Sequence, residues 1–517
     1  MKSASPVRAI LAAVIMLTLG ACAEETGGRG SSGAANPPPP AGGEPSGGGP
    51  APGSPAGEPG DTGGTDTAAP FERSVAYISS EDDGDEQKLY AIDIDGQNLV
   101  ELSGNPQRNG KVSSVVLSPD GRWAAYVAEH DRAKALDLYV TNRDGSIRQK
   151  LSSDIKRNSA VRSVTWSPDS SQLAYIISSS DSKKKDELWL VSADGSSNRR
   201  VVWDNESEFL SGSGYSWSAS GRFLGISVKR GYGMTYFSVS AIGEMQAVSV
   251  GIGNLFSNSW GAWSADEDRF AYISSVPFRA PVLTSYEADR GVRSEVVNTL
   301  NIGDGILALR WSPDSRYIAS FAPSKGGIFV APVSGGANTQ VSAEDSTGLS
   351  SARNFVWAPD NASVAMVAIE DRQYQLLLAR ADGSSTITYP LVDPGTKVRA
   401  SSAVFSPNSQ YLAYIDGRDQ GRLYISDGGG FGTRQTLASA DRPFGSLYWA
   451  RDGSGLLYEA ETSGDSKRAL RFVSLDGQQD SVVSTNLSDD DDEVLCIAVM
   501  PNGIARDQQN GCQLFSN

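Results

Sequence analysis

The chain has 517 residues, with 45 basic and 61 acidic side chains and a formal net charge of −16. A field of this sign repels phosphate backbones, so we expect no nucleic-acid partner. His130 is the only histidine, so a histidine-rich zinc site is excluded and a Ser-His-Asp triad would have to be built around this one residue. Its charged loop predicts an ordinary exposed side chain. We expect no catalytic residue, no bound metal and no cofactor.

Residues 1–21 have the pattern of a bacterial secretory signal. Two basic residues precede an apolar run, 9–19, which is too short to span a bilayer as a stable helix. The run ends in Leu19-Gly20-Ala21-Cys22, which resembles the lipobox of bacterial lipoproteins. The resemblance implies that Cys22 carries the lipid that holds the chain on a membrane. Ala23 replaces the aspartate that usually retains such proteins at the inner membrane, so we expect the outer membrane.

The next segment, residues 22–70, is predicted to be the acylated cysteine followed by a disordered linker. Between residues 26 and 69 there are 14 glycines and nine prolines. Such a composition cannot bury a core, so the segment should act as a tether. We expect the folded domain to occupy residues 71–517.

This predicted domain repeats one short pattern eight times. Each copy has a bulky residue, in six copies tryptophan, followed by a turn sequence such as Ser-Pro-Asp, and the copies are 44–51 residues apart. These anchor residues are Leu117, Trp166, Trp217, Trp263, Trp311, Trp357, Phe405 and Trp449. A second, mostly bulky position follows each anchor after nine residues. A fixed offset inside a variable period predicts a rigid hairpin joined by elastic loops, as in a propeller blade.

The turn chemistry agrees with four strands in each unit. The anchor should end the first strand, and the Ser-Pro-Asp turn leads to the second. Asp-Gly pairs such as Asp194-Gly195 then mark the hairpin between the third and fourth strands. We predict an all-β fold, a β-propeller of four-stranded antiparallel blades. The anchor tryptophans should therefore belong to the core.

The segment from Trp166 to Gly195 resembles the repeat of TolB and its relatives, and the resemblance covers about residues 72–503. The same repeat type forms the propellers of prolyl oligopeptidase-like enzymes. This similarity supports the fold strongly. It says little about function, because propellers perform many tasks.

The two ends of the domain predict its closure. Residues 75–77 and 89–93 match second and third strands without a preceding anchor, whereas 494–500 matches a lone first strand. A composite blade built from both ends would bring the count to nine, but eight is the more frequent number, so the prediction is eight or nine. Cys496 and Cys512 bracket the closing segment and form either a disulfide or two buried thiols.

Binding should concentrate on one face. The two tight turns of each unit project from one end of the blade, and the loops at the other end vary most: 129–135, 178–186, 204–214, 229–234, 343–353 and 416–421. The position four residues before each anchor should lie near the channel mouth on that face. The polar side chains there are Ser113, Arg162, Ser213, Ser259, Arg353 and Ser401. The two arginines could hold a carboxylate of a partner or form ordinary blade-to-blade ion pairs.

The favoured hypothesis is a monomeric, non-catalytic scaffold in the bacterial envelope. It would face the periplasm or the cell surface and bind a protein or peptide partner, in envelope assembly or integrity. One alternative is a hydrolytic or carbohydrate-active propeller enzyme, which would show turnover dependent on a loop carboxylate. Another is a small-ligand or calcium sensor, although the acidic run 489–493 lacks the spacing of a calcium loop.

Overall fold

The chain divides into two units, Met1–Thr65 and Asp66–Asn517, which are treated separately. The computed structural model describes residues 71–513 of the second unit apart from loop segments, of which the longest are 202–214, 251–261, 298–307, 391–402 and 500–510. Cys22 and the predicted linker lie outside the described residues. Within the described part, no helix has the length and apolar character needed to cross a membrane.

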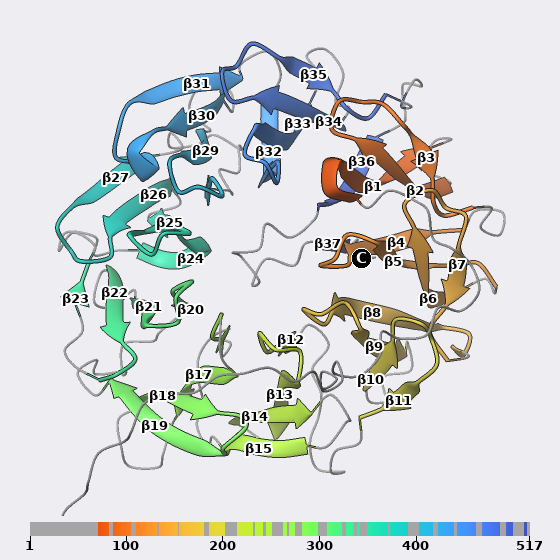
Figure 1. The fold of residues 1–517 in the computed structure, drawn as a ribbon, viewed down its shortest axis with the longest axis horizontal. Helices are drawn as coiled ribbons and strands as arrows, with labels where there is room; N and C mark the ends of the chain where they lie inside the picture. The colour runs from red at the N-terminus through yellow and green to blue at the C-terminus, as the bar shows by residue number, and fades with distance from the viewer. Residues whose placement is uncertain are drawn as a thin grey trace, which may run out of the picture. The chain divides into compact units, whose positions relative to one another are not determined.

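Eight blades are built from consecutive antiparallel strands, and we number them 2 to 9 in chain order (Figure 1). Their inner strands are β4 (Val112–Leu117), β8 (Ser159–Trp166), β12 (Tyr215–Trp217), β16 (Ala262–Trp263), β20 (Ala308–Trp311), β24 (Leu349–Trp357), β28 (Ala403–Phe405) and β32 (Arg442–Trp449). Their second strands are β5 (Trp123–Ala128), β9 (Gln172–Ser179), β13 (Phe223–Arg230), β17 (Arg269–Ser274), β21 (Tyr317–Ala322), β25 (Ser363–Glu370), β29 (Leu412–Asp416) and β33 (Gly455–Glu461).

The third and outer strands complete each blade. The third strands are β6 (Ala135–Asn142), β10 (Glu187–Ser192), β14 (Gly233–Ser240), β18 (Val282–Glu287), β22 (Gly327–Pro332), β26 (Gln373–Arg380), β30 (Arg422–Ser426) and β34 (Arg468–Ser474). The outer strands are β7 (Arg148–Lys150), β11 (Asn198–Arg200), β15 (Met245–Val250), β19 (Val292–Val297), β23 (Thr339–Gln340), β27 (Thr386–Pro390), β31 (Arg434–Ala438) and β35 (Asp480–Val482).

A composite blade, blade 1, joins the two ends of the domain. Strand β36 (Glu493–Ala498) pairs antiparallel with β1 (Ser74–Glu81), and β2 (Glu86–Asp93) and β3 (Val100–Glu101) follow outward. Tyr77 lies opposite Ile497 in this seam. The predicted composite blade is therefore confirmed, and the described strands form nine blades rather than eight. Blades 2 and 3 are also linked by a short parallel pairing of β6 with β8.

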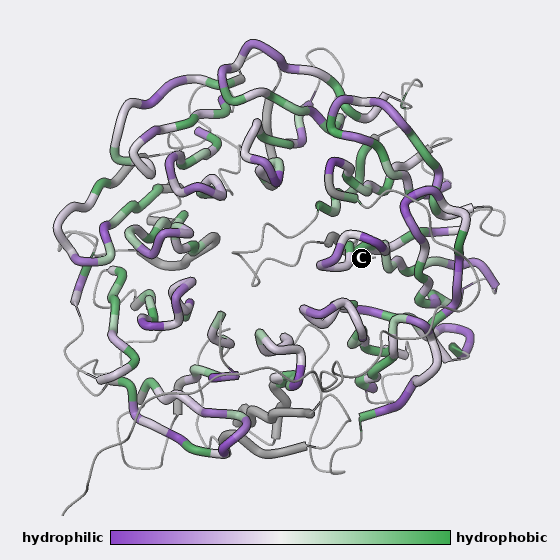
Figure 2. The backbone as a smooth tube through the Cα atoms, viewed as in Figure 1, coloured by the Kyte–Doolittle hydropathy of each residue, from purple (hydrophilic) through white to green (hydrophobic). Residues whose placement is uncertain are grey.

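The core lies between neighbouring blades. One apolar cluster, for example, joins Ala319 and Phe321 of blade 6 to Val364 and Leu377 of blade 7. Figure 2 shows apolar residues concentrated in the strands and hydrophilic residues at many of the turns. Burying both faces of a blade against its neighbours is the physical reason that the strands read as nearly continuous apolar segments.

Each inner strand of blades 2 to 9 ends at its anchor residue, as predicted. The indole N–H of each anchor tryptophan also donates to a backbone carbonyl on the inner strand of the preceding blade. The donor and acceptor residues are Trp166 and Val116 (3.2 Å), Trp217 and Thr165 (3.5 Å), Trp263 and Ser216 (2.9 Å), Trp311 and Ala262 (2.8 Å), Trp357 and Arg310 (3.2 Å), and Trp449 and Val404 (3.2 Å). The anchors are thus structural ties between blades.

The Ser-Pro-Asp turns make a second set of ties. In four turns the residue after Asp or Asn has positive φ without being glycine, and its side chain accepts a hydrogen bond from the turn of the preceding blade. The acceptors and donors are Ser170 Oγ and Asp120 N (3.0 Å), Ser315 Oγ and Ala265 N (2.9 Å), Asn361 Oδ1 and Asp314 N (2.9 Å), and Ser409 Oγ and Asp360 N (2.9 Å). The contact offsets the backbone strain of these residues.

Replacing Ser170 with alanine should lower the free energy of unfolding by about 1–2 kcal/mol, because the N–H of Asp120 loses its acceptor. Ser170→Gly should cost less, since glycine adopts positive φ without strain. Thermal and urea unfolding would measure both, with the exposed Ser196→Ala as control. Equal stability of S170A and the parent chain would contradict a tie at this position.

Both tight turns of a blade lie at the same end, as predicted. Backbone hydrogen bonds join them directly, from Ala193 N to Ser171 O in blade 3 and from Leu475 N to Ser454 O in blade 9. We call this end of the ring the turn face. The variable loops at the other end lie largely outside the described residues, so their predicted binding role stays a prediction.

Candidate functional site

The described channel positions lie at a recurring irregularity of the inner strands. Ser113 on β4 and Arg162 on β8 are both half-buried, and each lies where the register with the second strand shifts. Arg353 lies in the corresponding shift of β24, and β32 shifts at its own equivalent position. Such bulges leave residues outside the ladder. On β4 and β24 these are Ser113 and Arg353, whereas on β8 they are residues 163 and 164, because Arg162 still pairs with Ile176. The distance of four residues from each anchor was enough to locate these positions, but it contained no signal for the bulges.

The remaining predicted channel positions are either not described or lie far apart. Ser213, Ser259 and Ser401 lie outside the described residues. Strands β8 and β24, which carry Arg162 and Arg353, lie across the ring from each other (Figure 1). The structure therefore does not bring the two arginines into one local site, and any ligand that contacted both would have to extend across the channel.

A short C-terminal strand, β37 (Gly511–Gln513), lies along the inner edge of blade 2. It pairs antiparallel with β4, and Cys512 lies opposite Val115. This strand was not predicted, because three residues after a segment without alternation produce no periodic pattern. Its presence shows that the inner edge of β4 accepts an extended segment.

The closing segment also contains a covalent link. Cys496 on β36 is disulfide-bonded, and strand β36 contacts β37, which carries Cys512. The Cys496–Cys512 pairing stays a prediction, which peptide mapping under non-reducing conditions would test. Recovery of Cys512 as a free thiol in the oxidised protein would contradict it.

His130 differs from its prediction as an exposed loop residue, because its side chain is half-buried. The ring packs edge-on against Tyr139, with centroids 4.7 Å apart, and against Tyr126 at 5.8 Å. Its Nε2 atom also lies 3.3 Å from the Tyr126 hydroxyl. The two tyrosines flank the imidazole and shield it from solvent. The prediction of an exposed side chain was wrong because it rested on the charged neighbours in the sequence and not on these ring contacts. The contacts give His130 a structural role.

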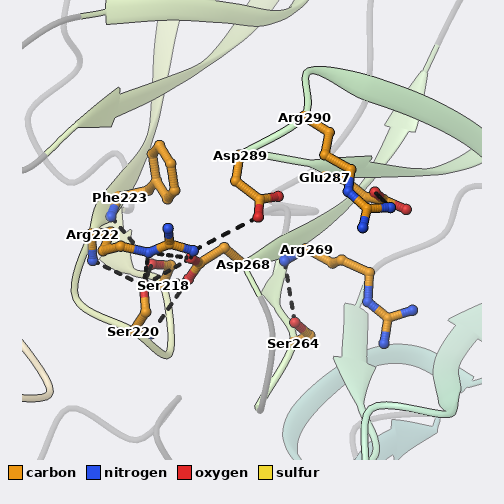
Figure 3. Close-up of polar contacts among 10 residues, drawn as sticks. All are labelled: Ser218, Ser220, Arg222, Phe223, Ser264, Asp268, Arg269, Glu287, Asp289 and Arg290. Atoms are coloured by element: carbon orange, nitrogen blue, oxygen red, sulfur yellow. Dashed lines mark hydrogen bonds and ion pairs between the residues drawn. The ribbon is translucent and has the colours of Figure 1, made fainter.

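The turn face between blades 4 and 5 contains a dense ionic network (Figure 3). Asp268 is almost fully buried and accepts hydrogen bonds from Ser220 Oγ at 2.7 Å and from Arg222 Nη2 at 2.5 Å. Burial raises the pKa of Asp268, but hydrogen bonds from Ser220, Ser218 and Arg222 outweigh it and leave the pKa below its usual value. Both carboxylate oxygens of Asp268, in blade 5, accept hydrogen bonds from blade 4, so the network ties the two blades together.

Glu459 is a titratable group that was not among the predicted site residues. It lies ten residues after the Trp449 anchor, a position that is apolar in six of the other seven units. It also follows Leu457 by two residues, so both side chains lie on the same side of β33, and Leu457 packs against blade 1. Burial raises the pKa of Glu459 to about 7, against the opposing charge of Arg468. The charged residue at a position that is otherwise apolar was the signal by which the sequence could have identified this buried carboxyl group.

This shift predicts a pH-dependent seam between blades 9 and 1. The folded state holds the Glu459 proton up to about pH 7, whereas the ordinary pKa is 4.5, so stability should fall as the pH rises between these values. Glu459→Gln should therefore raise the melting temperature at pH 8 and leave it unchanged at pH 4. Glu461→Gln, on the same strand, serves as control. An E459Q melting temperature below that of the parent at pH 8 would contradict the prediction.

No group of three or more His, Cys, Asp or Glu side chains in the described residues is arranged to hold a metal ion. Binding can be argued at the described channel positions and on the turn face.

No protein-family model and no curated protein matches the sequence. Among solved structures, one described as the eukaryotic initiation factor has a TM-score of 0.55 at 13% identity, covering 79% of this chain and 95% of its own. Dipeptidyl peptidase 4 from Porphyromonas gingivalis has a TM-score of 0.47 at 12% identity, covering 78% of this chain and 67% of its own. TolB from Acinetobacter baumannii has a TM-score of 0.29 at 14% identity, covering 69% and 78%.

Identities this low show a shared fold and nothing more, and the two TM-scores below 0.5 carry no argument about this chain. The first similarity agrees with the blade pattern read from the strands. The folded part of this chain is a β-propeller with nine described blades.

Proposed function

We propose that this chain is a non-catalytic scaffold of the bacterial envelope, which binds an extended segment of a protein partner at the inner edges of its blades. The observation that supports this most directly is β37, which lies antiparallel on the inner edge of β4. Strand edges present unpaired N–H and C=O groups, and adding a strand is a general mode of peptide recognition. The equivalent edges of other blades offer the same backbone groups.

Side chains at the bulges would add specificity to such backbone contacts. Ser113 and Arg162 are half-buried at the bulges of β4 and β8. A guanidinium there suits a carboxylate on the partner, because its planar fork can donate two parallel hydrogen bonds. The TolB-like repeat supports the same role by resemblance, with a place in envelope assembly or integrity.

Affinity purification of the full-length, lipid-anchored chain from solubilised envelopes would test this proposal. A specific protein should co-purify with the parent chain and be lost from the Arg162→Ala variant. It should remain with Arg122→Ala, a matched control because Arg122 is exposed on the turn face. Retention of the partner by R162A would contradict binding at the channel. Turnover of a peptide or saccharide would instead favour the enzyme hypothesis.

The membrane tether gives a separate prediction. Cys22→Ala should release the chain from the membrane into the soluble envelope fraction, because several acyl chains supply the anchoring free energy, at about 0.8 kcal/mol for each buried CH₂. Metabolic labelling with a radioactive fatty acid, followed by fractionation, would measure this. Cys496→Ser should leave the labelling unchanged. Membrane retention of C22A without label would show that another feature holds the chain there.

A further inference from the structure

A polar cavity of about 490 Å³ lies on the turn face where blades 7 and 8 meet. Asp360 and Arg380 line it from blade 7, and Asn408, Gln410 and Asp427 line it from blade 8. It is separate from the inner edges that carry the proposed function. Three departures from the repeat meet here.

The first departure is Ala358, which stands where most units have serine. In blades 2, 3 and 6 this serine donates its hydroxyl to the turn carboxylate or its equivalent oxygen, as Ser312 does to Asp314 at 2.6 Å. Ala358 has no hydroxyl to donate to Asp360. The Asp360 carboxylate still accepts the backbone N–H of Ala362 at 2.9 Å, which holds it in place. It consequently retains acceptor capacity beside the cavity.

The second departure is Arg380, at the end of β26. In blades 2, 3 and 9 this position holds a short polar side chain that caps its own turn, as Ser192 does for Ser197 N at 2.9 Å. Arg380 instead donates to Ser363 Oγ at 3.2 Å and to Gly428 O of blade 8 at 3.5 Å, and it lies over the Phe431 ring, 4.2 Å from the centroid. A guanidinium carries five N–H donors in one plane, so this packing positions it with donors to spare for a ligand.

The third departure is the turn between β30 and β31, which is longer than the Asp-Gly turns of other blades. Gly428, Gly429 and Gly430 have φ of 58°, 66° and 96°, and Gly429 and Gly430 are buried. A Cβ atom on Gly430 would come within 2.7 Å of Leu378 in blade 7. This glycine run lets the turn lie close to blade 7 and bring Phe431 under the Arg380 guanidinium.

The chemistry of the cavity identifies a class of ligand. Its lining has one cation, Arg380, and two carboxylates, Asp360 and Asp427, so it disfavours phosphate and other anions. Asn408 donates its amide N–H to Gln410 Oε1 at 3.1 Å, so the Gln410 amide is held in place with N–H donors to offer a ligand. The ring of Tyr411 adds an apolar face. Sugars combine hydroxyl groups that donate and accept with apolar C–H faces.

We propose that this cavity binds a neutral saccharide, with Asp360 and Arg380 holding neighbouring hydroxyl groups. The site would give the propeller a second ligand, in addition to a protein partner at the channel. The two proposals are independent, because the residues involved lie on different blades and surfaces.

The repeat itself supplies variants that should fold. Ala358→Ser restores the serine of other blades, whose hydroxyl would engage Asp360, and Arg380→Ser restores the side chain of Ser192 and Ser474. Asp360→Asn is compatible with the turn, because Asn408 occupies the equivalent position in blade 8. Ala450→Ser makes the same change as A358S in blade 9, away from the cavity, and is the matched control.

Saturation-transfer NMR and calorimetric titration of the intact protein would use glucose, galactose, mannose, N-acetylglucosamine, maltose and trehalose, with sodium phosphate as the anionic comparison. At least one sugar should bind. A358S, R380S and D360N should each weaken binding tenfold or more, whereas A450S should bind as the parent does. Melting temperatures would confirm that each variant is folded. No binding by any of the six sugars, stronger binding of phosphate, or unchanged affinity in folded R380S and D360N would overturn the proposal.

Discussion

Replacing Trp311 with alanine should lower the free energy of unfolding by about 3–5 kcal/mol, the range for deleting a buried aromatic side chain. The side chain is buried, and its indole N–H donates to Ala262 O of the preceding blade at 2.8 Å. Arg269 also lies over the ring, 5.3 Å from its centroid. The substitution would open a cavity between two blades and leave a buried carbonyl without its donor.

Denaturant unfolding followed by fluorescence and circular dichroism would measure the effect. Trp189 provides the comparison, because it is half-buried and its indole donates within its own blade, to Glu187. Trp311→Phe should cost more than Trp189→Phe, since only the first removes a bond between blades. If both phenylalanine variants lost the same stability, the anchors would not act as ties.

Removing the segment after residue 492 should prevent recovery of a monomeric folded protein. The truncation deletes β36, the inner strand of the composite blade, including the buried side chains of Val494 and Ile497. Each buried side chain of this size contributes about 1.5–3 kcal/mol, and its loss would also expose Ala76 and Ile78 on β1. The sum is comparable to the whole stability of a domain.

Truncation after Val499 is the matched control, since it keeps β36 and removes β37. It should yield a folded propeller that is less stable by about 3 kcal/mol, the contribution of closing the 16-residue interval between Cys496 and Cys512 if the two are bonded. Size-exclusion chromatography and thermal unfolding would compare both truncations. A monomeric, cooperatively melting product of the shorter chain would contradict closure by β36.

Much of the fold could be predicted because a propeller blade is a local structure. The distance from anchor to second strand is fixed by one tight turn, so it recurs in the sequence despite loops of different length. The composite blade was predictable for the same reason, since each end carries recognisable strands without their partners. The choice between eight and nine depended on whether β36 pairs with β1, which is a contact across the whole domain.

The candidate sites were less predictable, for two physical reasons. The bulges beside Ser113 and Arg162 depend on the register between strands, which a single-strand pattern does not contain. Strand β37 pairs with a segment almost 400 residues earlier in the chain. The cavity was visible in principle, because Ala358 and Arg380 break the repeat at aligned positions, but their proximity follows only from the packing of blades 7 and 8.

The central claim is that the inner side of the ring binds a protein partner. The most direct test is photo-crosslinking in intact cells, with a benzophenone amino acid placed at Ser113 or Arg162 and, for comparison, at Asp194 or Asp382, which are exposed on the turn face. The proposal predicts one discrete protein adduct from positions 113 and 162 and none from 194 and 382. Adducts confined to the turn face, or none at either pair of positions, would contradict it.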